Sequence, residues 1–159
     1  RFDEARTRFE KILGGHGIGF GSHNTYLLTI DYGWLLTRLG RYTEALPFLS
    51  KGLDLRPDVA YAWNALGVST YNSAHGPEDV QRAMDHLLKA VELQPRNAVL
   101  WSNTAAIASA GGAVEQAKMA VTNAIALSPS SDGGPAWNAN VLLNGVEGKP
   151  RLELFLELL

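Results

Sequence analysis

Apolar residues recur along this chain at steps of three and four positions, which is the spacing of one face of an α-helix. The stretches with this spacing are separated by short runs that contain glycine, proline, asparagine or aspartate, which favour helix ends and turns. The pattern therefore predicts an all-α chain, with helices at 1–13, 25–39, 42–55, 60–71, about 80–93, 98–110, 114–127, 135–144 and 151–159.

The expected helix ends follow from the residues that flank each stretch. Gly33 lies in the middle of a predicted helix and would cost about 1 kcal/mol relative to alanine, so we expect a neighbouring helix to approach closely there. Pro47 and Pro77 are expected in the first turns of their helices, where the missing N–H matters least. Side chains able to cap a helix start are Asn24, Thr43, Asp58 and Asn97.

A second pattern is superimposed on the first and occurs three times. It consists of an alanine, a bulky residue four positions later, a small residue, and a proline twelve positions after the alanine. The three copies are Ala45-Leu49-Gly52-Pro57, Ala83-Leu87-Ala90-Pro95 and Ala117-Val121-Ala124-Pro129.

The period of this pattern indicates stacked helical units. The prolines at 57, 95 and 129 are 38 and then 34 residues apart, and the longer interval reflects an insertion after Tyr71. We expect one array, with complete units at 24–57, 58–95 and 96–129, the second helix of a partial unit at 1–13, and a degenerate or capping unit at 130–159. Because the chain opens inside a unit, we expect it to be a piece of a longer protein.

These positions together resemble the tetratricopeptide repeat (TPR) family. In the second unit, Trp63, Leu66 and Gly67 precede the alanine pattern at the family's spacing, and Trp101 repeats Trp63 in the third unit. The resemblance implies a right-handed superhelical solenoid of antiparallel helix pairs. It also implies that the first helix of each unit lines a concave face, and that each unit contacts only its neighbours.

Composition narrows the classes of function. Hydrophobic residues make up 46% and charged residues 19% of the chain, as expected for a folded protein. The formal net charge of −2 disfavours a nucleic-acid module, and the absence of cysteine excludes disulfides and thiolate metal sites. No apolar run reaches the length of about 20 residues that spans a bilayer, and no signal segment is visible. We therefore expect a cytoplasmic protein.

Catalytic chemistry is not expected. No histidine has ligand spacing to another histidine or to an acid; the four are His16, His23, His75 and His86. The acid pairs Asp3/Glu4, Glu78/Asp79 and Glu153/Glu157 fit helix first turns and solvated faces better than general acid–base pairs. We predict no enzyme activity, no metal and no cofactor.

Binding is the expected function. The phase of each predicted first helix places a mixture of apolar, aromatic and amide side chains beside the core stripe, which fits a groove for a peptide or a partner helix. The alternative is that Trp34 and Tyr61 only pack the solenoid. The predicted groove residues are Leu27, Ile30, Asp31, Trp34, Arg38, Tyr61, Asn64, Ala65, Val68, Asn72, Val99, Ser102, Asn103, Ala106, Asn138 and Leu142.

Two functional subtypes of the family can be compared with these positions. The carboxylate clamp of chaperone-binding members is disfavoured, because Ile30, Trp34 and Val99 stand where it needs other residues, mainly cations. In the asparagine ladder of glycosyltransferase-associated members, Asn103 fits, Asp31 is a near substitute and Asn64 is displaced by one position. An accessory segment of such an enzyme is therefore one alternative function.

Two further segments carry open alternatives. The glycine-rich stretch at 14–21 is either a linker or a ligand-contacting loop that uses Phe20 or His23. The apolar segment 151–159 either packs within the last unit or docks onto a neighbouring chain. Docking would make the protein a self-assembling homo-oligomer or filament, with Leu152, Phe155 and Leu158 as the association candidates.

Overall fold

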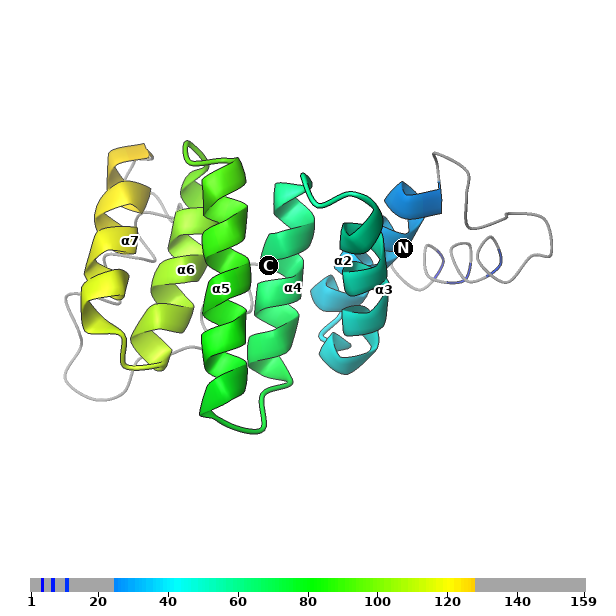
Figure 1. Ribbon diagram of the computed structural model, residues 1–159, viewed down its shortest axis with the longest axis horizontal. Coiled ribbons are helices and arrows are strands. Elements are labelled where there is room, and N and C mark those ends of the chain that lie inside the picture. The colour runs from blue at the N-terminus through cyan, green and yellow to red at the C-terminus, as the bar shows by residue number, and fades with distance from the viewer. Residues whose placement is uncertain (1–3, 5–6, 8–10, 12–24, 128–159) are drawn as a thin grey trace.

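The computed structural model describes residues 4, 7, 11 and 25–127, and all of its regular structure in these residues is helical (Figure 1). Residues 4, 7 and 11 lie in helical backbone within the predicted helix 1–13. The predicted elements at 135–144 and 151–159 and the glycine-rich stretch at 14–21 lie outside the described residues. The bounds of the remaining helices are α2 Thr25–Arg38, α3 Tyr42–Leu55, α4 Ala60–Asn72, α5 Pro77–Leu93, α6 Ala98–Ala110 and α7 Val114–Leu127.

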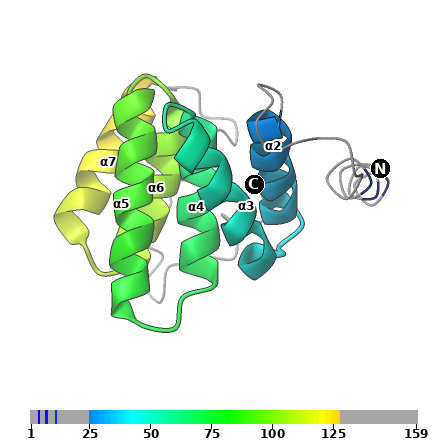
Figure 2. The same cartoon turned by 45° about the vertical axis from the view of Figure 1, so that its right-hand side comes forward.

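The helices form three pairs that stand in a row (Figures 1 and 2). Within the pairs, α2 packs on α3, α4 on α5 and α6 on α7. Between the pairs, α3 packs on α4 and α5 on α6, and the first helices also contact one another, α2 with α4 and α4 with α6. This arrangement is a helical-repeat solenoid, as the sequence predicts, and the three pairs fall within the predicted units 24–57, 58–95 and 96–129.

The repeated pattern forms the interior of the array. Its alanine, bulky and small positions are all buried, and its prolines at 57 and 95 are exposed in the turns between units. The apolar core is a series of clusters rather than one centre, and three of the four clusters among the described residues cross a unit boundary. Stability therefore depends on contacts between neighbours. The buried pattern residues are Ala45, Leu49, Gly52, Ala83, Leu87, Ala90, Ala117, Val121 and Ala124.

Two glycines of the first helices lie where the paired helix leaves no room for a side chain. A Cβ atom on Gly33 would lie 2.7 Å from Cγ of the fully buried Leu49, so the close approach expected at this position is present. A Cβ on Gly67 would lie 2.8 Å from Leu87 Cγ and 3.0 Å from the carbonyl oxygen of Ala83. A side chain at either position requires the two helices to separate or the neighbouring leucine to move.

A recurring indole hydrogen bond joins the second and the third unit to the unit before it. Trp63 Nε1 donates to the carbonyl oxygen of Pro57, and Trp101 Nε1 donates to that of Pro95, both at 2.8 Å. In each case the tryptophan follows the proline by six residues, so the closing proline and the next first helix form one local motif. Trp137 follows Pro129 by eight residues and lies outside the described residues.

The helix ends differ in part from the predictions. Asn97 caps α6, since its side chain accepts a hydrogen bond from the Val99 N–H at 3.1 Å, and Pro77 occupies the start of α5 as predicted. The cap predicted at Thr43 is wrong, because α3 already begins at Tyr42. For the same reason Pro47 lies in the second turn of α3 rather than in the first.

The cap predicted at Asp58 is also wrong, because this carboxylate is held by a cation instead. Both oxygens of Asp58 accept hydrogen bonds from Arg56 at 2.8 Å, and no side chain caps α4. The pairing with Arg56 lowers the pKa of Asp58 to about 2. The cap predicted at Asn24 lies outside the described residues.

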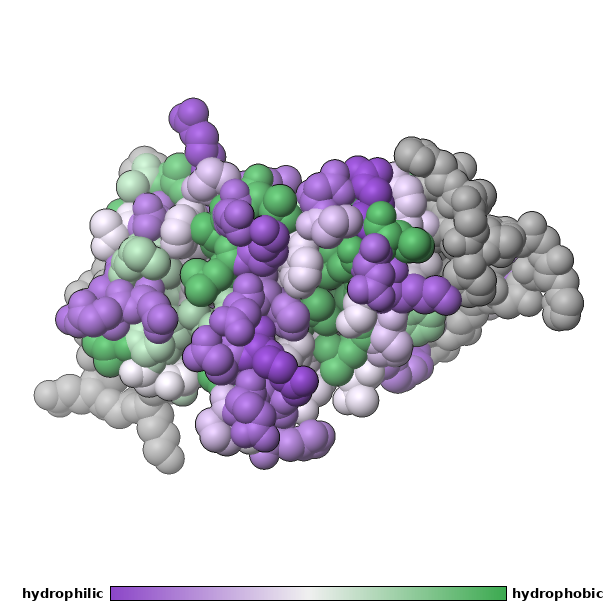
Figure 3. All heavy atoms as spheres, viewed as in Figure 1, coloured by the Kyte–Doolittle hydropathy of each residue, from purple (hydrophilic) through white to green (hydrophobic). Residues whose placement is uncertain are grey.

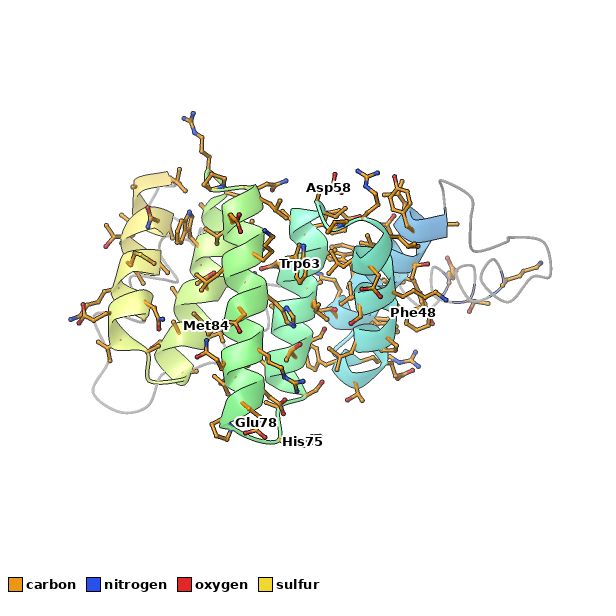
Figure 4. The ribbon with its side chains drawn as sticks, viewed as in Figure 1. Phe48, Asp58, Trp63, His75, Glu78 and Met84 are labelled. Atoms are coloured by element: carbon orange, nitrogen blue, oxygen red, sulfur yellow. The ribbon has the colours of Figure 1, made fainter. Side chains whose placement is uncertain are left out.

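The insertion after Tyr71 is taken up mainly by a longer second helix. α5 has 17 residues where α3 and α7 each have 14. The turn before α5 is held by the His75 backbone N–H, which donates to Asp79 Oδ2 at 2.8 Å. Figure 4 shows His75 in this turn and Asp58 in the turn at the opposite end of α4.

Replacement of Gly33 by alanine tests whether close approach limits the fold. We expect Gly33→Ala to lower the free energy of unfolding by about 1–3 kcal/mol, because the new methyl group overlaps Leu49. Helix propensity alone would instead favour alanine by about 1 kcal/mol. Urea denaturation followed by circular dichroism measures the change. Ser50→Ala, at an exposed position of α3, is the control and should stay within about 0.5 kcal/mol of the parent. Equal or greater stability of Gly33→Ala would contradict the constraint.

Candidate functional site

Four of the eight large apolar side chains that are exposed in the described residues lie on the first helices of the three pairs. α2 exposes two large apolar residues, and α4 and α6 expose one each, although these helices are mostly buried. We call their exposed side the first-helix face. The four side chains are Leu27 (39% exposed), Trp34 (41%), Tyr61 (38%) and Val99 (47%). The face also includes Asp31, Arg38, Asn72 and Asn103.

Tyr61 is fixed across the boundary between the first two pairs. Its hydroxyl donates to Asp31 Oδ1 at 2.7 Å, so α4 and α2 are joined at the surface of the face. Partial burial, and then the hydrogen bond to Asp31, raises the pKa of Tyr61 above its ordinary value. Tyr61 is therefore a neutral donor throughout the physiological range.

Trp34 is oriented by a cation on the same helix. The Arg38 guanidinium carbon lies 5.8 Å from the Trp34 ring centroid, one helical turn along α2. This is within the range of a cation–π interaction, and it leaves most of the guanidinium donors available. The indole keeps a large exposed surface next to a positive charge.

Amide side chains occupy the central part of the face. Asn103 Nδ2 on α6 donates to Asn64 Oδ1 on α4 at 2.9 Å, and Asn72 Nδ2 donates to the Val68 carbonyl oxygen at 2.8 Å. These bonds fix the two half-buried amides and leave the side-chain oxygens of Asn72 and Asn103 as acceptors. Asn64 itself is buried, so its contribution to the face is the hydrogen bond to Asn103.

Six predicted groove residues, Asn64 and five others, are buried, and their placement in an open groove is wrong. Ile30 is fully buried (0% exposed), because it packs against Gly52, where a Cβ atom would lie 2.3 Å from Ile30 Cγ1. Val68 packs in the cluster formed by α4, α5, α6 and α7. The others are Ser102, Ala65 and Ala106, whose helices pack against neighbours on both sides. Asn138 and Leu142, like the association candidates Leu152, Phe155 and Leu158, lie outside the described residues.

Charge is separated between the two sides of the array. α4 and α6 contain no aspartate, glutamate, lysine or arginine, and α2 contains only Asp31 and Arg38. α3, α5 and α7 carry all the other charged residues of these six helices, and Figure 3 shows a hydrophilic band over α5. The uneven distribution of charged residues can be read from the sequence, but the spacing of apolar residues alone does not indicate it.

The described histidines lie away from the first-helix face. His86 on α5 stacks against Trp63, with ring centroids 5.5 Å apart, and burial lowers its pKa. His75 lies in the turn before α5, where Asp79 also pairs with Arg82.

Residues 25–127, with 4, 7 and 11, contain no cluster of His, Cys, Asp or Glu suited to hold a metal ion. In the same residues, no helix is long and apolar enough to cross a membrane.

Comparisons with solved structures agree with this architecture. MamA (residues 41 to the end) from Desulfovibrio magneticus RS-1 has a TM-score of 0.68 and 22% identity, over 83% of this chain and 69% of that one. YrrB, described as a TPR protein with an unusual peptide-binding site, has a TM-score of 0.69 and 24% identity, over 87% and 66% respectively. At these identities the likeness shows the fold, a TPR-like helical repeat. No protein-family model matches the sequence, and no curated protein is significantly similar to it.

The His86–Trp63 contact predicts a pH dependence of stability. Because burial lowers the pKa of His86 in the folded state, the unfolded chain binds this proton first, at its ordinary pKa of about 6.5. The stabilising effect is complete above that pH and is lost as the pH falls toward the folded pKa. We expect urea denaturation to show a steeper loss of stability on acidification in the parent than in His86→Gln. Ser50→Ala, at an exposed position of α3 without a titratable group, is the control and should follow the parent. Identical pH profiles for His86→Gln and the parent would contradict the assignment.

Proposed function

We propose that this protein is a non-catalytic scaffold for protein–protein interaction, which binds a peptide or a partner helix across the first-helix face. The observation that carries the proposal is the exposure of Leu27, Trp34, Tyr61 and Val99 on one side of three successive first helices. Large apolar side chains gathered on one surface are typical of interaction sites, and Trp and Tyr are the commonest binding anchors.

The anchors are ordered before any partner arrives. Arg38 lies over Trp34, and Asp31 accepts the hydroxyl hydrogen bond of Tyr61. Side chains held in this way lose less conformational entropy on binding, so more of the contact energy contributes to affinity. This arrangement supports a binding role over a purely packing role for the two aromatic residues.

The chemistry of the face favours a peptide over other classes of ligand. Arg38 is the one cation on the described first helices, which does not suit a phosphate backbone or a cationic carboxylate clamp. The similar fold of YrrB, with its described peptide-binding site, supports the same class of ligand.

As the compartment we propose the cytoplasm, on the lack of cysteine.

Truncation of the two aromatic anchors tests the proposal. We expect Trp34→Ala combined with Tyr61→Ala to abolish capture of partners from a cell extract, because each anchor contributes at least about 1–2 kcal/mol. Affinity purification with mass spectrometry identifies the partners of the parent, and titration with each purified partner measures the loss. Circular dichroism verifies that the double variant remains folded.

The matched control removes exposed apolar side chains elsewhere. Leu55→Ala with Leu127→Ala truncates exposed residues of α3 and α7, the second helices of their pairs, and should leave affinity unchanged. Unchanged affinity of the Trp34/Tyr61 double variant, with its fold intact, would rule out the first-helix face as the site.

Self-assembly is the second candidate function, and α7 supplies the observation that favours it. This last described helix exposes Val114 (57%) and Met119, so the array presents apolar residues at this end. Self-assembly predicts a solution mass that rises with concentration and returns to the monomer in Val114→Glu with Met119→Glu. Analytical ultracentrifugation over a concentration range measures the mass, with Leu55→Glu as the control. A monomer at all concentrations would eliminate this candidate.

A third candidate, an accessory segment of a larger enzyme such as a glycosyltransferase, is tested by the sequence that adjoins this stretch.

A further inference from the structure

The separation of charge indicates what kind of peptide fits the first-helix face. Over α4 and α6 the face offers the apolar groups of Tyr61 and Val99 and the amides of Asn72 and Asn103, but no ionised side chain. A charged residue of a partner would lose its hydration on this surface without gaining a counter-ion, which costs several kcal/mol. Backbone amides and hydroxyl groups of a partner, by contrast, find acceptors in the two asparagines.

α2 is different, because it carries one accessible cation. Arg38 is exposed, and in the described part of the chain it forms no ion pair with an acid. Asp31, the acid of the same helix, is half-buried and already accepts the hydroxyl of Tyr61. Arg38 is therefore the more accessible of the two charges on α2, and it offers a site for one anion adjacent to the exposed indole of Trp34.

We propose that the partner is a peptide segment that is uncharged where it crosses α4 and α6 and that carries a single carboxylate at α2. The carboxylate pairs with Arg38, and an apolar side chain beside it contacts Trp34. This inference rests on the proposed function and specifies its ligand. Because only one ion pair is formed, it fixes the register and direction of the peptide rather than supplying most of the affinity.

The length of the segment follows from helix spacing. Packed helices lie about 10 Å apart, so the distance from α2 to α6 is roughly 20 Å. An extended chain covers this distance with about 6 residues. In a random library of peptides about twice that length, a complete binding segment can therefore begin at any of several positions within a peptide.

Selection from such a peptide-display library on the full chain is the first measurement. We expect binders rich in apolar and amide residues, with one aspartate or glutamate at a constant position next to a large apolar residue and no other charges in the core of the motif. Selection on the Arg38→Glu variant should replace that acid by lysine or arginine. Selection on Arg96→Glu, which makes the same charge change in the exposed turn before α6, should return the original motif.

Affinities of one selected peptide complete the test. Arg38→Glu should weaken binding by about threefold to tenfold, which corresponds to loss of a largely solvated ion pair. A peptide with lysine in place of its acid should recover the loss on the Arg38→Glu chain only. Arg96→Glu should bind the original peptide as the parent does.

The possible failures are distinguishable. Binders that require Trp34 and Tyr61 but carry several charges, or that ignore Arg38→Glu, would overturn this inference and leave the proposed function standing. Binders that tolerate Trp34→Ala with Tyr61→Ala, or the absence of any enriched peptide, would overturn both.

Discussion

Close packing of each first helix against its partner is the constraint on which the structure depends. At Gly33 and Gly67 there is no space for a methyl group, because Leu49 and Leu87 fill the volume. Helices this close must pack along a continuous line of small and bulky residues, which is what the repeated alanine pattern supplies. Each first helix is then covered by its partner and by its neighbours, and only a narrow strip of α2, α4 and α6 remains exposed.

The narrowness of that strip explains why the spacing of apolar residues predicted the helices correctly but placed several buried residues in the groove. The periodicity and the spacing of the alanine pattern were sufficient to predict the helices, their pairing and the solenoid. The same periodicity placed Ile30, Val68 and Ser102 on the open side, because a helical wheel assumes that a helix packs against one partner. In the stack each first helix also contacts the neighbouring pairs. Ile30 packs on Gly52 and shares a cluster with α4, Val68 packs with α5, α6 and α7, and α6, which carries the buried Ser102, contacts α4 and α5 as well as α7.

The site could be predicted in part. Contacts between residues close in the sequence were predictable, and contacts between distant residues were not. Trp34 and Arg38 are four residues apart on one helix, so their contact is implied by the sequence alone. The bonds from Tyr61 to Asp31 and from Asn103 to Asn64 join residues 30 and 39 positions apart, and they depend on the register between units. Competition between local partners was likewise not predictable, since Asp58 can cap α4 or bind Arg56 and the bidentate ion pair is the stronger of the two.

The distribution of charge gives the two sides of the array different physical roles. On the second helices, pairs such as Lys89 with Glu92 and Lys118 with Glu115 are exposed and contribute little to stability, but they keep that surface hydrated. The first-helix face carries only Asp31 and Arg38, both on α2, and is the more easily dehydrated surface. Contact there removes water from apolar side chains at little electrostatic cost. Discrimination among partners must then come from the fit to Trp34 and Tyr61, from hydrogen bonds to fixed amides, and from the exclusion of charge.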